Sequence, residues 1–165
     1  SLLELARLES GLSLNLESVA LAPLIKEVWE SMALSLEQKK IVLSMTLEDL
    51  WIEGDKGHLN KLVRNLATNA LRHTPEGGTI TVSLIEQDGQ AILVVDNDGQ
   101  QIPDADLPRL WDPFYRVDKA RNRSDGGTGL GLTIVRAAVL AHGGTCEVEN
   151  RSGGVRFRVS LPCGK

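Results

Sequence analysis

The sequence has few cysteines, few aromatic residues and no long apolar run. Cys146 and Cys163 are its two cysteines, and they form neither a C-x-x-C pair nor a disulfide framework, so a reduced intracellular setting is expected. No apolar run approaches the roughly 18 residues of a membrane span, and no signal-peptide pattern opens the sequence. The three histidines lack metal-ligand spacing, which argues against zinc. The sequence also lacks a Gly-x-Ser-x-Gly elbow and a Ser/His/Asp set.

Neither positive nor negative charge is in large excess in the sequence. Eighteen Lys and Arg stand against 22 Asp and Glu among 165 residues, for a net charge of −4, so the whole chain offers no attraction for nucleic acid. A hydrophobic content of 42% is enough to bury a core and excludes disorder. The length fits one domain. Residues 1–11 form the pattern of a helix end, which predicts that the chain is part of a longer protein.

Hydrophobic spacing predicts a mixture of strands and helices. A long helix should begin after Asp55 as its N-cap and stop near Thr74, before Pro75. The other expected helices cover residues 1–11, 23–36, 105–111 and 132–142, and the expected strands cover 12–16, 41–47, 50–53, 79–86, 91–95, 145–149 and 155–161. No repeated βαβ unit is visible. The pattern predicts an α/β fold, a two-layer sandwich with one mixed sheet and helices on one face.

The long helix carries the first group of candidate functional residues. Asn65, Asn69 and Arg72 share one side, roughly 110° from the centre of its apolar face. That apolar face consists of Leu59, Leu62, Val63, Leu66, Ala67 and Ala70. Amide oxygens are hard ligands that suit Mg²⁺. Taken alone, the same residues also fit a solvated polar face.

Three further segments could contact a phosphate-bearing ligand. Residues 126–131 are rich in glycine and run into a helix, where backbone amides and the helix start favour an anion. Their pattern is neither a P-loop nor a dinucleotide fingerprint. Arg116, Lys119, Arg121 and Arg123 form a basic cluster, and the mostly polar segment 95–103 lies at the end of a strand. Each of these is also compatible with an ordinary loop.

In this order and spacing, the motifs resemble the catalytic, ATP-binding domain of sensor histidine kinases, within the gyrase–Hsp90–kinase–MutL ATPase superfamily. Residues 65–74 resemble the N box, and Asn97-Asp98-Gly99 occupies the G1 box. Residues 112–116 resemble the F box, and residues 127–132 the G2 box. Residues 5–11 resemble the end of a dimerisation-domain helix, so the resemblance divides the chain into that helix end, 1–11, and a catalytic domain, 12–165.

The resemblance implies a role for each matching residue. Asn69 is the expected Mg²⁺ ligand, with Asn65 supporting it, and Arg72 and His73 should reach the phosphates and the nucleoside. Arg116 should contact the γ-phosphate of ATP from a mobile lid. The remaining expected nucleotide contacts are Asn97, Gly99, Lys119, Arg121, Gly127, Thr128, Gly129, Leu130 and Gly131.

Two positions depart from the family pattern. Asn97 stands where an Asp accepts from the adenine amine, and Gln101 stands where a second glycine is usual. An Asn still offers a carbonyl oxygen as acceptor. The family's phosphoacceptor histidine belongs to a dimerisation domain, and none of His58, His73 and His142 has that context.

The resemblance therefore implies a kinase domain that binds ATP and Mg²⁺ and transfers the γ-phosphate to a histidine on its dimerisation domain. It implies a response regulator as the partner of the full-length protein, a cytoplasmic place in a membrane-anchored bacterial sensor, and a monomeric fragment. A catalytically inactive nucleotide-binding module is the alternative. A gyrase- or Hsp90-type ATPase fits less well, because Asn65 cannot activate water as a general base.

Overall fold

A five-stranded mixed sheet forms one layer of the fold in the computed structural model, which describes residues 13–115 and 131–163. The strand order is β2-β4-β5-β7-β6, with β2 parallel to β4 and every other neighbouring pair antiparallel. The strands are β2 (Val42–Leu47), β4 (Thr79–Gln87), β5 (Gln90–Asp98), β6 (Thr145–Arg151) and β7 (Gly154–Pro162).

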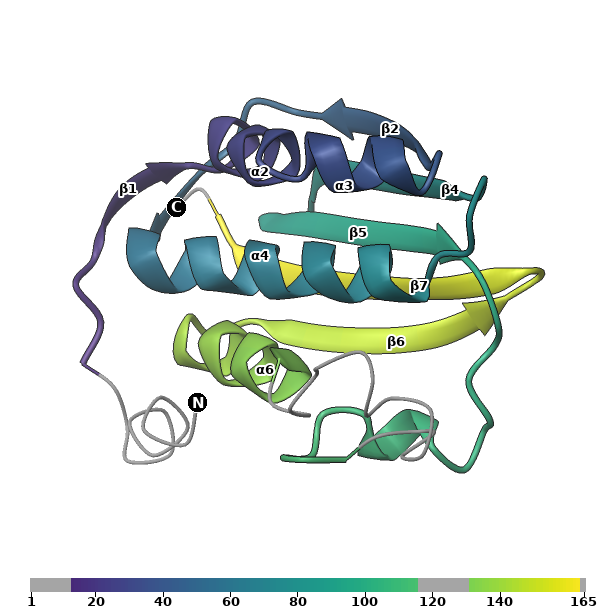
Figure 1. The fold of residues 1–165 in the computed structure, drawn as a ribbon. Coiled ribbons are helices and arrows are strands. Elements are labelled where there is room, and N and C mark those ends of the chain that lie inside the picture. Colours follow the sequence, from purple (N-terminus) through teal and green to yellow (C-terminus); the bar gives the residue numbers. More distant parts are fainter. Residues whose placement is uncertain (1–12, 116–130, 164–165) are drawn as a thin grey trace.

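Helices form the second layer and cover one face of this sheet (Figure 1). They are α2 (Leu21–Glu30), α3 (Ala33–Gln38), α4 (Lys56–His73) and α6 (Gly131–Ala141). No helix of the described residues is long and apolar enough to span a bilayer. The predicted fold class, a two-layer α/β sandwich with a mixed sheet, is confirmed.

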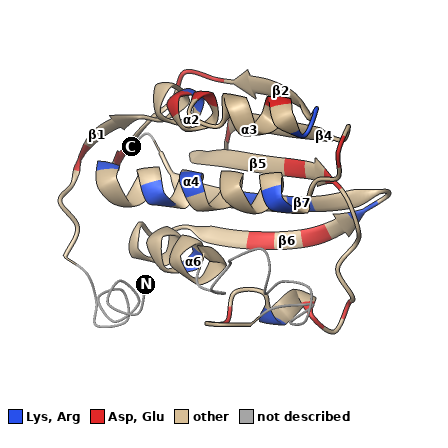
Figure 2. Cartoon of the chain, in the orientation of Figure 1, with Lys and Arg blue, Asp and Glu red and all other residues tan. Residues whose placement is uncertain are grey.

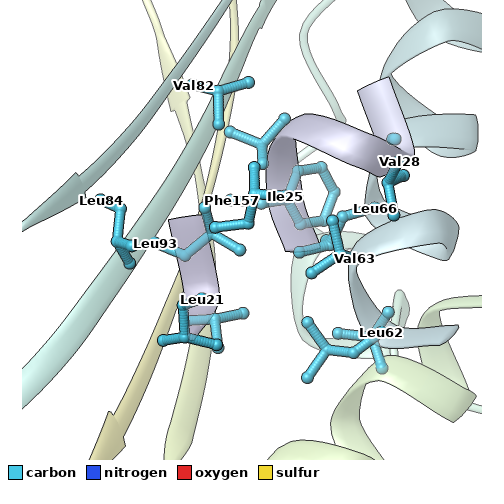
Figure 3. Packing of buried hydrophobic residues seen from close by; sticks show 14 of the residues in the cluster. Leu21, Ile25, Val28, Leu62, Val63, Leu66, Val82, Leu84, Leu93 and Phe157 are labelled. Atoms are coloured by element: carbon cyan, nitrogen blue, oxygen red, sulfur yellow. The ribbon is translucent and has the colours of Figure 1, made fainter. Parts of the chain in front are cut away.

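The core lies between the two layers (Figure 3). Side chains of a strand alternate between its faces, and the inward set of β4, which includes Val82 and Leu84, is almost fully buried. These residues meet Ile25 of α2 and Leu66 of α4 from the helix side. The outward set is polar or charged over most of the sheet, as Thr81, Glu147 and Arg158 illustrate.

The long helix α4 agrees closely with its prediction. The Asp55 side chain accepts from the backbone N–H of His58 at 3.1 Å, and Thr74 is the C-cap. The predicted apolar face is the buried face, residue for residue: Leu59, Leu62, Val63, Leu66, Ala67 and Ala70.

The helix predicted over residues 23–36 is instead two helices. The first, α2, ends at Glu30, where the Ser31 hydroxyl donates to the carbonyl of Val28 at 2.6 Å. A side chain that bonds to the preceding turn competes with helix continuation. The chain then begins α3 at Ala33, so the apolar spacing continues across a break that the pattern does not reveal.

Residues 13–16 do not form the predicted strand. The backbone N–H of Asn15 donates to the Asp55 carboxylate at 2.9 Å, and strand pairing begins only at Glu17, opposite Gly54. The resulting β1 (Glu17–Ala20) and β3 (Trp51–Gly54) form a two-stranded sheet apart from the main one. The helix predicted over residues 1–11 lies outside the described part of the chain, as does residue 12.

The helix predicted over residues 105–111 is shorter and tighter than expected. It is the single 3₁₀ turn η1 (Leu107–Arg109). Its backbone bonds join residues three apart, as from the Arg109 N–H to the Asp106 carbonyl at 3.0 Å.

Candidate nucleotide site

The polar side of α4 lies beside its buried face, as predicted. Asn65 and Asn69 are half-buried, whereas Arg72 and His73 at the end of the helix are exposed. The charged residues of α4 are all Lys or Arg, and no acid lies between its ends (Figure 2). Amides together with cations on one helix suit a phosphate group and its Mg²⁺.

The start of α6 lies next to Asn65. A Cβ atom on Gly131 would be 3.5 Å from the Oδ1 of Asn65. In the same turn, the Thr133 hydroxyl donates to the Trp111 carbonyl at 2.8 Å. The fold thus brings the last residue of the glycine-rich segment and the N-terminus of an 11-residue helix to the polar side of α4. The partial positive charge of a helix start favours an anion there.

Asn97 near the end of β5 is a buried polar residue, only 3% exposed. It has the same strand parity as Leu93 and Val95, so its side chain lies on the helix-covered face. Its Nδ2 donates to the Asp98 carbonyl at 2.9 Å. Its Oδ1 has no partner among the described residues.

Gly99 brings the loop after β5 against the end of α4. Its φ is +151°, and a Cβ at this position would lie 2.7 Å from the carbonyl oxygen of His73. A side chain at Gly99 would therefore push the loop away from the helix. The contact places Asn97 and Gly99 beside the last turn of α4, which carries Asn69, Arg72 and His73.

The segment before Arg116 is held against the sheet by its aromatic residues. Trp111 meets Phe157 of β7 edge to face, with ring centroids 5.9 Å apart. The Tyr115 hydroxyl donates to Asp106, and the Arg109 guanidinium lies 4.6 Å from the centre of the Tyr115 ring. Together with the bond from Thr133 to the Trp111 carbonyl, these contacts anchor this segment beside the start of α6.

Asp98 is bonded to protein groups rather than available to a ligand. Its carboxylate accepts from Arg151 at 2.9 Å and from the backbone N–H of Thr79 at 2.9 Å. The hydrogen bond from Arg151, followed by that from Thr79, lowers the pKa of Asp98 below its ordinary value. Asp96 likewise pairs with Arg151 and Arg156. These acids belong to a charge network on the outward face of the sheet.

Several predicted contacts lie outside the described residues. They are Arg116, Lys119, Arg121, Arg123, Gly127, Thr128, Gly129 and Leu130.

Two residues that support the site were not predicted. Lys39 donates from Nζ to the carbonyls of Leu71 and Arg72 at 2.8 and 3.3 Å, at the end of α4. No local pattern points to this contact, because the partners are 32 and 33 residues apart. Asn150 bonds to the loop after β5. Asn150 lies on the inward face of β6, as Cys146 and Val148 do. An amide at a position where an apolar residue is expected could have indicated this contact from the sequence.

The comparison with protein families assigns the class. Residues 54–165 match the family model described as histidine kinase-, DNA gyrase B-, and HSP90-like ATPase. The chain belongs to this family. The match includes α4, β5 and α6, the elements that meet at the candidate site.

Within the family, the curated relatives are sensor kinases. The chain is 47% identical over 111 residues to the "Probable sensor kinase SilS" of Salmonella typhimurium, covering 67% of this chain and 22% of SilS. It is 38% identical over 142 residues to the sensor histidine kinase CusS of Escherichia coli K12, covering 86% of this chain and 30% of CusS. The chain therefore spans less than a third of the length of these relatives.

Solved structures give the same assignment. The catalytic domain of the histidine kinase ThkA, in a nucleotide-free form, has a TM-score of 0.82 at 29% identity, covering 91% of this chain and 97% of that domain. Full-length ShkA, solved with AMPPNP, has a TM-score of 0.86 at 27% identity, covering 99% of this chain and 35% of ShkA. ThkA has also been solved with the response regulator TrrA, with a TM-score of 0.77 at 27% identity, covering 90% of this chain and 42% of that one. The chain is a sensor histidine kinase catalytic domain.

Proposed function

We propose that this domain binds ATP with Mg²⁺ at the polar side of α4 and presents the γ-phosphate to a histidine on its dimerisation domain. The observation that carries the proposal is the convergence of three distant segments. Asn65 of α4 meets the start of α6 at Gly131, and the carbonyl of His73 meets Gly99 after β5. Amide oxygens, a helix N-terminus and cations thus lie along the C-terminal half of α4, over a length of about 12 Å.

The side chains at this site are of the kinds that bind a nucleotide together with Mg²⁺. Asn69 would ligate Mg²⁺ and Asn65 would support the metal–phosphate end, since a hard cation prefers oxygen ligands. Arg72 would contact the phosphates and His73 the nucleoside. The Oδ1 of Asn97 would accept from the adenine amine. The ShkA complex with AMPPNP supports a nucleoside triphosphate as the ligand.

Catalysis would consist of positioning and charge neutralisation. Phosphoryl transfer needs little covalent chemistry from the protein. The protein has to hold the γ-phosphate in line with its acceptor and to offset the charge of the phosphate. Arg116 is the expected γ-phosphate contact, with Lys119 and Arg121 beside it. Gly127, Thr128, Gly129 and Leu130 would contribute backbone donors. The acceptor nitrogen belongs to the dimerisation domain.

The same proposal covers the rest of the protein. Residues 1–11 would be the end of the dimerisation helix and 12–165 the catalytic domain, monomeric by itself. The full-length protein would act with a response regulator, as the ThkA–TrrA complex supports. The resemblance also implies a membrane-anchored bacterial sensor with this domain in the cytoplasm.

The test removes the expected metal ligand. Asn69→Ala should weaken Mg²⁺-dependent ATP binding at least about tenfold and abolish phosphate transfer to a supplied dimerisation domain. Asn60→Ala, on the same helix but nine residues earlier, is the matched control and should behave as the parent. Calorimetric titration with and without Mg²⁺ gives the affinity, and phosphohistidine formation on the added domain gives the transfer.

Full Mg²⁺-dependent affinity in Asn69→Ala would overturn the metal assignment. A parent that binds ATP but transfers nothing to a competent acceptor would favour the inactive module instead, to which the Asn97 replacement points. Steady-state hydrolysis without an acceptor would favour the ATPase alternative, which Asn65 in place of a general base argues against.

A further inference from the structure

The loop that follows Asn97 is bonded to the hairpin formed by β6 and β7. Asn150 of β6 forms two reciprocal bonds with one residue of this loop. The N–H of Ile102 donates to the Oδ1 of Asn150 at 2.8 Å, and the Nδ2 of Asn150 donates to the carbonyl of Ile102 at 2.7 Å. Pro103 follows Ile102 and has no N–H, so a regular strand ladder could not continue here. The Asn150 amide takes the place of a neighbouring strand for this single residue.

Two more bonds join the same loop to the same hairpin. The N–H of Gly99 donates to the carbonyl of Gly153 at 3.0 Å, and the Gln101 Nε2 donates to the carbonyl of Arg151 at 2.6 Å. Gln101 is one of the two positions that depart from the family pattern, and a glycine there could not make this bond. Three of the four residues from Gly99 to Ile102 are therefore attached to the hairpin.

The hairpin itself is attached to the end of β5. Arg151 donates to Asp96 at 2.6 Å and to Asp98 at 2.9 Å, on either side of Asn97. Gly154 lies so close to the strand that a Cβ there would collide with the carbonyl oxygen of Asn97. The hairpin thus contacts both the strand that carries Asn97 and the loop that follows it.

We propose that the hairpin residues 150–154 position the base side of the nucleotide pocket and that Asn150 is the main positioning residue. This inference rests on the proposed function, in which Asn97 reads adenine and Gly99 lies against the last turn of α4. Asn150 does not reach the ligand in this proposal. It acts through Ile102. By holding residues 99–102 against the hairpin, it keeps the Asn97 oxygen facing the base.

The experiment compares affinity for two bases. Asn150→Ala should weaken ADP binding about fivefold to tenfold, because it removes both hydrogen bonds between the Asn150 side chain and the backbone of Ile102. Binding of GDP, which lacks the amine that Asn97 reads, should change less, so the ADP-over-GDP preference should narrow. Calorimetric titration with each nucleotide measures both, and hydrogen exchange at Ile102 should become faster. A purely structural role would weaken both nucleotides in parallel.

Three variants sharpen the test. Asn150→Asp keeps the side-chain volume and the acceptor for the Ile102 N–H, but places a carboxylate oxygen against the Ile102 carbonyl, so the loss of ADP affinity should persist. Thr145→Ala, exposed on the same strand, is the matched control and should bind as the parent. Gln101→Gly removes one bond from an exposed side chain. It should weaken ADP binding about two- to threefold even if Asn150→Ala does not fold.

The outcomes separate the two claims. A parent that binds neither ATP nor ADP overturns the proposed function and this inference with it. A parent that binds ADP, alongside Asn150 and Gln101 variants with unchanged affinity and base preference, overturns the positioning role alone. The same holds if ADP and GDP affinities fall by equal factors.

Discussion

At the scale of single residues, Asn97 is a polar side chain buried beside apolar ones. It lies on the inward face of β5 after Val95 and is 3% exposed. Burying an amide without full hydrogen bonding costs free energy. Its nitrogen is bonded to the Asp98 carbonyl, while its oxygen has no hydrogen-bond partner among the described residues. An acceptor kept at this place is the reason for assigning the adenine amine to it.

Changing Asn97 should alter base recognition in both directions. Asn97→Asp should tighten ADP binding by about 1 kcal/mol, roughly fivefold, because a charged acceptor forms a stronger bond than a neutral one. Desolvation of the carboxylate reduces that gain. Asn97→Ala should weaken ADP binding and reduce the preference for adenine over guanine. Titration of the three proteins with ADP and GDP measures this, and an Asn97→Ala protein with parental affinity and preference would refute the assignment.

At the scale of elements, the start of α4 is tied to two other segments through Asp55. The Asp55 carboxylate accepts from the N–H groups of Asn15 and His58. The Asp55 N–H donates to the Nε2 of His142, 3.0 Å away at the end of α6. Because Nε2 is an acceptor, Nδ1 of His142 carries the hydrogen and donates to the Ala138 carbonyl at 2.7 Å. His142 thus connects the two helices through both of its ring nitrogens.

Removing this cap should destabilise the domain in a pH-dependent way. Asp55→Ala should lower the free energy of unfolding by about 1–2 kcal/mol at neutral pH. Partial burial would raise the pKa of Asp55, but the N–H donors of Asn15 and His58 outweigh it and hold this pKa below 3.8. The carboxylate's contribution is therefore present above about pH 4 and lost as the pH falls through the lower folded-state pKa.

Denaturant unfolding between pH 3 and pH 7 checks this prediction. The variant should lose less stability than the parent on acidification. Asp49→Ala, which changes an exposed loop acid, should show the acid sensitivity of the parent. An Asp55→Ala protein with an unchanged slope against pH would contradict the cap's electrostatic role.

At the scale of the whole molecule, one core joins both layers. Leu66 of α4 is 2% exposed and lies among Val63, Ile25 and Phe157, which come from helices and sheet alike (Figure 3). The proposed nucleotide site lies on the same helix, on its neighbouring side. Site and core are therefore not separable units, and loss of packing at Leu66 should loosen the whole domain.

A matched pair of leucine substitutions tests this dependence. Leu66→Ala should lower the free energy of unfolding by about 2–5 kcal/mol, because it leaves a cavity between the layers. Leu140→Ala, also helical but 54% exposed, should change it by less than about 0.5 kcal/mol. Chemical denaturation gives both values. Equal effects of the two changes would contradict the position of the core.

The sequence alone determined what depends on local pattern. The N-cap at Asp55 and the six buried residues of α4 follow from spacing, because a helix buries whichever side its apolar residues share. The two hairpins of the sheet follow from alternation and turn residues, as at Asp88-Gly89. The order of the motifs from Asn65 to Gly131 was likewise enough to indicate the family.

The tertiary structure decided what depends on partners far away in the chain. The pairing of Glu17 with Gly54 places the first strand at residues 17–20 rather than 12–16. The contact between Gly99 and His73 brings the loop after β5 to the end of α4. The bonds between Asn150 and Ile102 link residues 48 apart. A local pattern specifies which side of an element becomes buried, but not which other element covers it. That choice is made by packing and by backbone groups that need hydrogen-bond partners wherever the chain is buried.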